Sequence, residues 1–174
     1  DKEESIKDND VEMLSLAQFI GRLFLEQEQY VESEEYYKVA MQGSEKICGP
    51  NSPSTMILLG NIAVVFKKKG DMKEAETMFN RCLQRKEAVL GVAHESTLGT
   101  VLNIAAFLRE NKRYRESIGM YKRALHVQEE QYGENHDLTL KTVEDLASVH
   151  LEMGSTKDTL GLLLRILTSK TVQM

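Results

Sequence analysis

The stretch that decides the fold runs from Gly91 to Leu125 and reads GVAHESTLGTVLNIAAFLRENKRYRESIGMYKRAL. Its landmark residues recur before and after it at a constant step of 42 positions. The positions that keep this step are Gly49, Gly91 and Gly133; Thr55, Thr97 and Thr139; Ala63, Ala105 and Ala147; and Phe79, Tyr121 and Leu163. Because a single shift aligns several kinds of residue, the chain is predicted to be an array of one repeated structural unit.

Each repeat is predicted to be an antiparallel pair of helices, A and B. Apolar residues recur at steps of three or four from Val11 onward, which is the helical period, and Ser52-Pro53 is a typical helix start. We expect helices at 11–27, 31–47, 53–69, 73–90, 95–110, 115–132, 137–153 and 157–170. The repeats then span 11–49, 50–91, 92–133 and 134–170, between a flexible acidic leader at 1–10 and a tail at 171–174. The predicted fold class is all-α, a right-handed α-solenoid of four helix pairs.

Small residues at matching positions predict where the helices approach closely. These are Gly21, Ala63, Ala105 and Ala147 in the A helices, and Ser33, Ala75, Ser117 and Thr159 in the B helices. Replacing Ala105 with Leu should therefore cost roughly 1–3 kcal/mol through overpacking. No pair can bury its faces alone, so stability is expected to come from contacts between neighbouring pairs.

Composition and charge exclude several classes of function. The net charge is −5, and no basic stripe of the kind that binds nucleic acid is present. No apolar run is long enough to cross a bilayer, so membrane insertion is not expected. No metal-ligand spacing, phosphate loop or nucleophile–base pair is found. We therefore expect no enzyme activity, metal or cofactor, and an intracellular location, most simply the cytoplasm.

The histidines and cysteines have simple structural interpretations. His94 and His136 precede A helices at the position that Ser52 holds in the second repeat, which predicts helix capping. Cys48 and Cys82 have no disulfide or metal spacing, and both are expected to be reduced, buried or half-buried thiols.

The order of motifs within a repeat resembles the tetratricopeptide repeats of kinesin light chains. The matching segments are His94-Glu-Ser-Thr97, Leu102-Asn-Ile-Ala105, Tyr114-Arg-Glu-Ser117 and Tyr121-Lys-Arg-Ala-Leu125, with Asn135-His136-Asp-Leu-Thr139 in the fourth repeat. The resemblance implies that residues 11–170 form a tetratricopeptide-repeat domain. It also implies a non-enzymatic adaptor that binds short acidic peptides bearing a large apolar residue.

In stacked helix pairs the A helices line a concave groove, which is the predicted binding site. The residues assigned to it by register are Arg22, Asn61, Val64, Lys67, Lys68, Leu102, Asn103, Ala106, Arg109 and Lys141. Asparagine amides can bond the backbone of an extended peptide, and the cations would favour carboxylates flanking an apolar anchor. The alternative is that the asparagines bond an adjacent helix turn and that the lysines are simply solvated.

The last helix suggests a second function. It is apolar nearly all round, whereas a terminal repeat normally needs a polar outer face. Its candidate assembly residues are Leu160, Leu163, Leu164 and Leu167. Either the native array continues beyond Met174 or this face packs on another molecule. The leading hypothesis is thus an adaptor or scaffold for linear motifs of partner proteins. The alternative is a structural subunit that self-associates or joins a complex through this helix.

Overall fold

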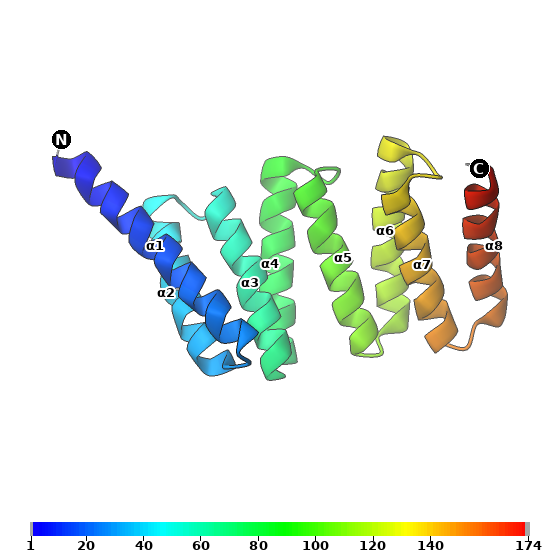
Figure 1. Ribbon diagram of the computed structural model, residues 1–174, viewed down its shortest axis with the longest axis horizontal. Coiled ribbons are helices and arrows are strands. Elements are labelled where there is room, and N and C mark those ends of the chain that lie inside the picture. The colour runs from blue at the N-terminus through cyan, green and yellow to red at the C-terminus, as the bar shows by residue number, and fades with distance from the viewer. Residues whose placement is uncertain (1, 173–174) are drawn as a thin grey trace. The chain divides into compact units, whose positions relative to one another are not determined.

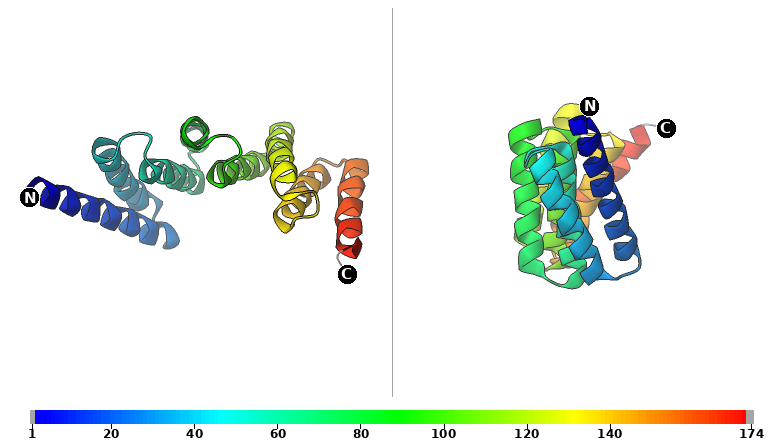
Figure 2. Two further views of the ribbon diagram at one scale, coloured as in Figure 1. Left: turned by 90° about the horizontal axis from the view of Figure 1, so that it is seen from above. Right: turned by 90° about the vertical axis from the view of Figure 1, so that its left-hand side faces the viewer.

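The computed structural model describes residues 2–172, which contain eight α-helices and no strand (Figure 1). The helices are α1 (Lys2–Glu26), α2 (Tyr30–Ile47), α3 (Pro53–Lys69), α4 (Met72–Leu90), α5 (Glu95–Glu110), α6 (Tyr114–Tyr132), α7 (Asp137–Glu152) and α8 (Thr156–Val172). They form two compact units, an N-terminal unit of residues 1–92 and a C-terminal unit of residues 93–174. Within each unit, consecutive helices are antiparallel neighbours (Figure 2).

The helix bounds agree closely with the prediction except at the two ends. The helices at 53–69 and 95–110 begin and end where the sequence predicts. The expected start at 11 is wrong, because α1 begins at Lys2 and runs through most of the leader. Residues 2–10 contain no Pro or Gly and include several strong helix formers, so the helix can continue without an apolar period. At the other end α8 continues to Val172, through the first two residues of the predicted tail, and residues 173–174 lie outside the described part of the chain.

Side chains cap the A helices as predicted. The Nδ1 atom of His94 accepts a hydrogen bond from the backbone N–H of Ser96 at 3.1 Å, and Nδ1 of His136 accepts one from Leu138 at 3.2 Å. Ser52 Oγ accepts from Thr55 N at the start of α3. These bonds satisfy backbone donors that would otherwise have no partner. The capping interpretation of both histidines is confirmed.

The turn from helix A to helix B uses a residue with positive φ in every repeat. The four residues, again 42 positions apart, are Glu28 (φ 60°), Gly70 (φ 94°), Lys112 (φ 59°) and Gly154 (φ 81°). Glu28 and Lys112 are not glycine, and an L-residue adopts this left-handed backbone conformation at a cost in free energy. The backbone bonds that follow repeat as well: Arg113 N donates to Leu108 O at 2.9 Å, as Asp71 N does to Phe66 O. These hydrogen bonds give partners to backbone carbonyl groups at the C-terminal end of each A helix.

The predicted small residues are buried where the A and B helices of a pair meet. Ser33 Oγ donates to the carbonyl oxygen of Gly21 at 2.8 Å, and Ser117 Oγ donates to that of Ala105 at 2.7 Å. A Cβ atom added to Gly21 would lie 3.1 Å from the ring of Tyr37, which is itself buried. These positions therefore set how closely the two helices pack.

The two cysteines differ in their surroundings. Cys82 is fully buried, as expected. Cys48 lies at the end of α2 and is exposed, so the expectation of a buried or half-buried thiol is wrong there. Its place at the exposed C-cap, one residue before the turn at Gly49, explains the difference.

Candidate functional site

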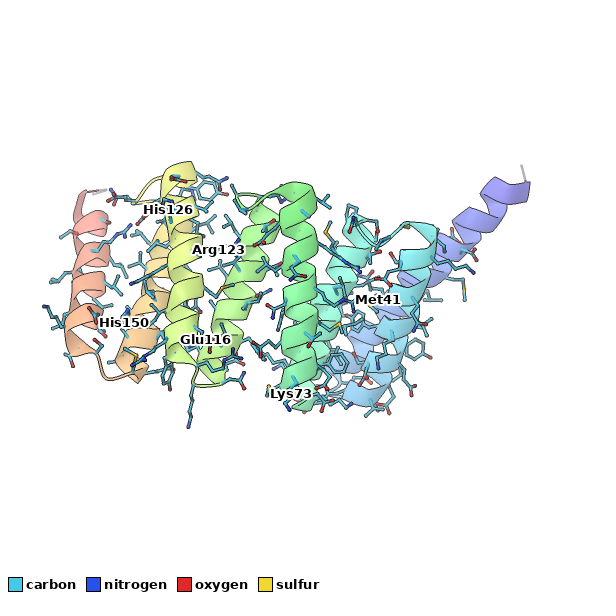
Figure 3. All side chains as sticks on the ribbon, turned by 180° about the vertical axis from the view of Figure 1, so that it is seen from behind. Met41, Lys73, Glu116, Arg123, His126 and His150 are labelled. Atoms are coloured by element: carbon cyan, nitrogen blue, oxygen red, sulfur yellow. The ribbon has the colours of Figure 1, made fainter. Side chains whose placement is uncertain are left out.

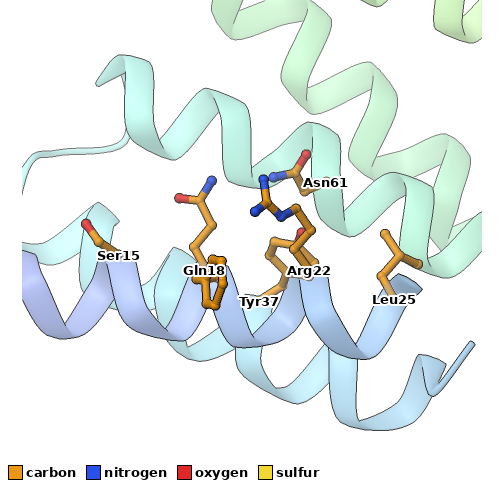
Figure 4. A pocket seen from close by; sticks show the side chains of 7 residues that line it. Ser15, Gln18, Arg22, Leu25, Tyr37 and Asn61 are labelled. Carbon is orange, nitrogen blue, oxygen red and sulfur yellow. The ribbon is translucent and has the colours of Figure 1, made fainter. Parts of the chain in front are cut away.

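The N-terminal unit contains a pocket of about 500 Å³ between α1, α2 and α3. Gln18 and Arg22 point from α1 toward α3, where Asn61 lies beside the guanidinium group (Figure 4). The lining residues are Ser15, Gln18, Phe19, Arg22, Leu25, Tyr37 and Asn61. The pocket therefore joins two of the predicted groove residues, Arg22 and Asn61, with apolar side chains.

Arg22 supplies the positive charge of this pocket and remains accessible. Its side chain is 60% exposed, and its Nε atom lies 3.7 Å from a carboxylate oxygen of Glu26. Its guanidinium carbon lies 5.3 Å from the centre of the Phe19 ring. An ion pair this exposed is worth about 0–1 kcal/mol. A ligand carboxylate could therefore replace Glu26 at small cost.

The inner wall of the pocket is an aromatic side chain. Burial raises the pKa of the Tyr37 hydroxyl above its ordinary value, and the charge of Arg22 partly offsets this. The phenol is therefore neutral at physiological pH and can act as a hydrogen-bond donor. With Phe19 and Leu25 it gives the pocket an apolar surface beside a cation.

Asn61 has an unused amide. Its side chain is half-buried and makes no hydrogen bond to any residue that the structure describes. The same is true of the exposed Asn103 in the C-terminal unit, judged over residues 2–172. The alternative in which these asparagines bond an adjacent helix turn is therefore not seen. Each amide retains two donors and one acceptor for a ligand.

The other predicted residues of the N-terminal unit follow Asn61 along α3 but do not line the pocket. Val64 and Lys67 are half-buried, and Lys68 is exposed. Lys67 and Lys68 belong to the basic last turn of α3, Lys67-Lys68-Lys69. Lys69 lies 2.9 Å from carboxylate oxygens of both Glu34 and Asp71. The adjacent Lys68 extends the positive charge of this surface beyond Arg22.

In the C-terminal unit the predicted cations are paired with acids. Arg109 Nε lies 3.5 Å from a carboxylate oxygen of Glu152, and its side chain is half-buried. Lys141 Nζ lies 3.2 Å from Glu144 and 3.6 Å from Asp145. Leu102 and Ala106 are half-buried on α5, the helix that also carries Asn103 and Arg109. The basic character predicted for this part of the groove is thus largely neutralised.

The acids of this region also act on the buried phenol below it. Burial and, to a smaller extent, the charge of Asp145 raise the pKa of Tyr121 to about 12, while Arg109 opposes this. The strongest cause is burial, because Tyr121 is a core residue packed among α5, α6 and α7. Among the nearby charges, Asp145, Glu110 and Glu152 raise this pKa and Arg109 lowers it, so the surroundings of Tyr121 are acidic on balance, in contrast to the pocket at Arg22.

A smaller pocket of about 270 Å³ lies between α7 and α8. It is lined by Asp137, Leu140, Lys141, Glu144, Leu163 and Ile166. Lys141 was predicted for the groove and Leu163 for the assembly face, so the structure brings together residues assigned to different sites. The four predicted assembly residues, Leu160, Leu163, Leu164 and Leu167, are all exposed on α8.

Sequence reasoning did not assign Ser15, Phe19 or Tyr37 to the site. The repeat register contained a usable signal for Phe19, because it holds the position of Asn61 and Asn103 in the first repeat. Another pocket of about 400 Å³, at the turn between α5 and α6, was also missed. It is lined by Lys112, Arg113, Tyr114, Arg115, Glu116 and Met153, and the run of basic residues around Tyr114 was its only signal.

Two other histidines are visible among the side chains of Figure 3. His126 is exposed on α6 near Glu130, and His150 is buried on α7 with its Nδ1 atom 3.5 Å from Asp158. Over the described residues, no group of three His, Cys, Asp or Glu side chains is placed to hold a metal ion. None of the helices in that range combines the length and the apolar character needed to cross a membrane.

Comparison with known proteins places the chain among repeat proteins. The tetratricopeptide repeat profile matches residues 12–88 and 97–169. No curated protein matches the chain. Among solved structures, BtubC (BKLC) from P. vanneervenii superposes with a TM-score of 0.80 at 15% identity. The match covers 92% of this chain and 64% of BtubC, so the chain spans less than two thirds of that protein.

A second similar structure is a kinesin light chain-type protein of Podosopora anserina with nearly identical TPR-like repeats. It superposes with a TM-score of 0.81 at 17% identity, covering 92% of this chain and 76% of that protein. At such identities the likeness concerns the fold, and the fold prediction is confirmed. Tetratricopeptide repeats generally serve as scaffolds for interactions between proteins. The chain belongs to the tetratricopeptide repeat family, and its all-α solenoid fold is of the kinesin-light-chain type.

Proposed function

We propose that the chain is a non-enzymatic adaptor that holds linear motifs of partner proteins on its A-helix surfaces. The preferred motif carries acidic residues flanking one large apolar residue. The observation that supports this most is the pocket at Arg22. It combines an accessible cation, the unused amide of Asn61 and an apolar surface formed by Phe19, Leu25 and Tyr37.

The three parts of this pocket suggest three roles in binding. Arg22 would take a carboxylate of the motif in a charge-assisted bond. Asn61 would bond the backbone of the extended peptide, because a side-chain amide offers both a donor and an acceptor. The rings of Phe19 and Tyr37 would enclose the apolar residue, which is where most of the affinity of such complexes resides.

The predicted residues of the C-terminal unit form a second part of this proposal. Asn103 and Arg109, with Leu102, Ala106 and Lys141 beside them, would form a separate binding surface on the C-terminal unit. Arg109 would first have to give up Glu152, its partner at 3.5 Å. A smaller contribution is therefore expected there than from Arg22.

A binding measurement tests the role of the pocket. A labelled peptide with one large apolar residue between acidic residues is titrated with the protein, and fluorescence anisotropy reports binding. Arg22→Glu should weaken binding about tenfold or more, because a charged hydrogen bond is worth roughly 1.5–3 kcal/mol. Asn61→Ala should weaken it roughly two- to tenfold, as expected for a neutral bond.

The matched control is Arg115→Glu, which makes the same charge change at an exposed arginine of α6 outside the pocket. It should leave the affinity nearly unchanged. Raising the salt concentration should weaken binding to the wild-type protein, because the contact is partly ionic and exposed. If Arg22→Glu and Asn61→Ala bind the peptide as tightly as the control, this pocket is not the site.

A second candidate function is self-association or assembly through α8. The observation that favours it is the exposed row of leucines on that helix, Leu160, Leu163, Leu164 and Leu167. Apolar side chains gathered on one exposed helix face commonly mark a protein–protein contact.

A further inference from the structure

The turn between α5 and α6 carries more positive charge than the equivalent turns of the other repeats. Residues 112–116 contain three cations and one acid. The segments at the same register contain at most one cation each; they are 28–32, 70–74 and 154–158. All four segments begin with a residue of positive φ, so the backbone forms the same kind of turn in each. The cations are therefore not needed to make the turn.

The stability of α6 does not explain these cations either. The start of an α-helix carries a positive partial charge, so acids are favoured there and cations are not. Arg113 directly precedes α6, and its side chain makes no capping hydrogen bond. Asp71 and Ser155 hold this position in the second and fourth repeats. A local preference that is broken without a structural gain points to a functional reason.

These cations surround the pocket of about 400 Å³ at this turn, which we call the turn pocket. Its lining residues are Lys112, Arg113, Tyr114, Arg115, Glu116 and Met153. All of them belong to the C-terminal unit, and Glu116 is labelled in Figure 3. Pockets that bind small ligands or single side chains have volumes of about 300–1,000 Å³, so the turn pocket is large enough for such a group.

Two of the three cations are available to a ligand. Lys112 and Arg115 are exposed, and neither has an ion pair or a side-chain hydrogen bond with any residue that the structure describes. Arg113 is held differently, because its Nε and one terminal nitrogen each lie 2.7 Å from a carboxylate oxygen of Glu116. This pairing lowers the pKa of Glu116 below its ordinary value of 4.5. The lining thus carries three positive charges and one negative charge at neutral pH.

The turn pocket also has an apolar wall. Tyr114 is half-buried and packs against the core cluster that contains Tyr121 and Val143, so its ring is held in place. Met153 ends α7 and is 43% exposed. A phenol ring and a thioether both make favourable contacts with an aromatic ring. The pocket therefore offers a surface for an aromatic group beside two available cations.

We infer that the turn pocket binds a phosphorylated tyrosine side chain of a partner protein. A phosphate monoester carries a charge of about −1.5 to −2 at neutral pH, which balances the net positive charge of the lining, whereas one carboxylate balances only half of it. Lys112 and Arg115 would bind the phosphate oxygens through charge-assisted hydrogen bonds. The ring of the ligand would lie against Tyr114 and Met153. Phosphoserine would supply the charge without the ring.

This inference goes beyond the peptide binding proposed at Arg22. The turn pocket and the pocket at Arg22 share no residue and belong to different units. Their ligands also differ, since carboxylates are expected at Arg22 and a phosphate in the turn pocket. Binding in the turn pocket would therefore depend on whether the partner protein is phosphorylated. Because the residues are separate, Arg115→Glu is a control for one pocket and a test of the other.

A titration with three matched peptides tests the inference. Each labelled peptide has one central residue between glycine and serine residues, and fluorescence anisotropy reports binding. The phosphotyrosine peptide should bind saturably, and the tyrosine peptide should bind at least about tenfold more weakly, because it lacks the charged hydrogen bonds. The phosphoserine peptide should bind about two- to tenfold more weakly than the phosphotyrosine peptide, because it lacks the aromatic contact.

Substitutions identify the side chains responsible. Lys112→Glu and Arg115→Glu should each weaken binding of the phosphotyrosine peptide about tenfold or more. Glutamate is compatible with position 112, because Glu28 adopts the same left-handed conformation in the first repeat. Met153→Ala should weaken binding of the phosphotyrosine peptide and leave that of the phosphoserine peptide nearly unchanged.

Lys122→Glu is the matched control. Lys122 is an exposed lysine of α6 that does not line the turn pocket, so this variant makes the same charge change as Lys112→Glu outside the pocket. It should bind the phosphotyrosine peptide within about twofold of the wild-type affinity, since an exposed charge at a distance is largely screened by salt. Circular dichroism checks that all variants are folded.

Several outcomes would overturn the inference. One is equal binding of the phosphotyrosine and tyrosine peptides, and another is wild-type affinity in both Lys112→Glu and Arg115→Glu. Equal binding of the phosphoserine peptide would overturn the assignment to tyrosine. Sedimentation with phosphatidylcholine vesicles that contain phosphatidylinositol bisphosphate, without binding of any peptide, would assign the pocket to a lipid headgroup instead. The proposed function fails by a different result, which is unchanged binding of the acidic peptide by Arg22→Glu.

Discussion

Replacing the buried Ala105 with Leu should destabilise the C-terminal unit more than the same replacement at the half-buried Ala106 of α5. Ala105 is fully buried and packs in the cluster that contains Tyr121 and Val143. Its carbonyl oxygen also accepts the 2.7 Å hydrogen bond from Ser117 Oγ. A larger side chain can be accommodated only if α6 moves away, and that movement stretches this bond.

The expected cost follows from these two effects. Overpacking in a close-packed core costs typically 1–3 kcal/mol, and loss of one buried hydrogen bond costs about 0.5–1.5 kcal/mol. Together they predict a loss of about 1.5–4.5 kcal/mol. Because whole domains are stable by only about 5–15 kcal/mol, this should shift the unfolding transition clearly.

Urea unfolding followed by circular dichroism measures this loss. Gly99→Ala is the matched control on the same helix, since a Cβ atom at Gly99 would meet no atom within 4 Å. It should stabilise the protein by about 0.5–1 kcal/mol, because Ala is a better helix former than Gly. If Ala105→Leu unfolds at the same urea concentration as the wild type, close packing at this position does not hold the pair together.

Two further changes test the polar contacts. Ser117→Ala should lower the free energy of unfolding in urea by about 0.5–1.5 kcal/mol, because it removes a buried hydrogen bond. Ser148→Ala is the control, since it removes an exposed hydrogen bond on α7, and it should change the free energy of unfolding by less than about 0.5 kcal/mol. Equal effects of the two changes would contradict the role given to Ser117. Burial alone would raise the pKa of Glu34, but hydrogen bonds from Lys38 and Lys69 hold it below its ordinary value of 4.5. A carboxyl with a lowered pKa in the folded state stabilises that state above the unfolded pKa and loses this effect as the pH falls through the folded pKa. Thermal unfolding should therefore show Glu34→Gln less stable than the wild type at neutral pH, with the difference shrinking below pH 4.5, and a constant difference would refute this assignment.

The repeated architecture could be predicted from the sequence because its determinants are local. Helix starts depend on a capping side chain within three residues, as at Ser52, His94 and His136. The close approach of paired helices depends on one small residue in each helix, such as Ala105 in α5 and Ser117 in α6. Both kinds of signal recur at a fixed step, so each copy reinforces the others. The first helix was misjudged because residues 2–10 continue it by propensity alone, without the apolar period on which the prediction relied.

The candidate site depended on contacts between residues far apart in the sequence. Register assigned similar roles to Arg22 and Arg109, which are both arginines of an A helix. Folding placed Glu152 of α7 at 3.5 Å from Arg109, whereas the contacts of Arg22 within the described part of the chain are with the exposed Glu26 and the ring of Phe19. The sequence alone therefore determined the repeat, its helices and their close-packed positions. Which cation stays available was decided only by the tertiary structure, because charge pairing depends on neighbours that the repeat pattern does not specify.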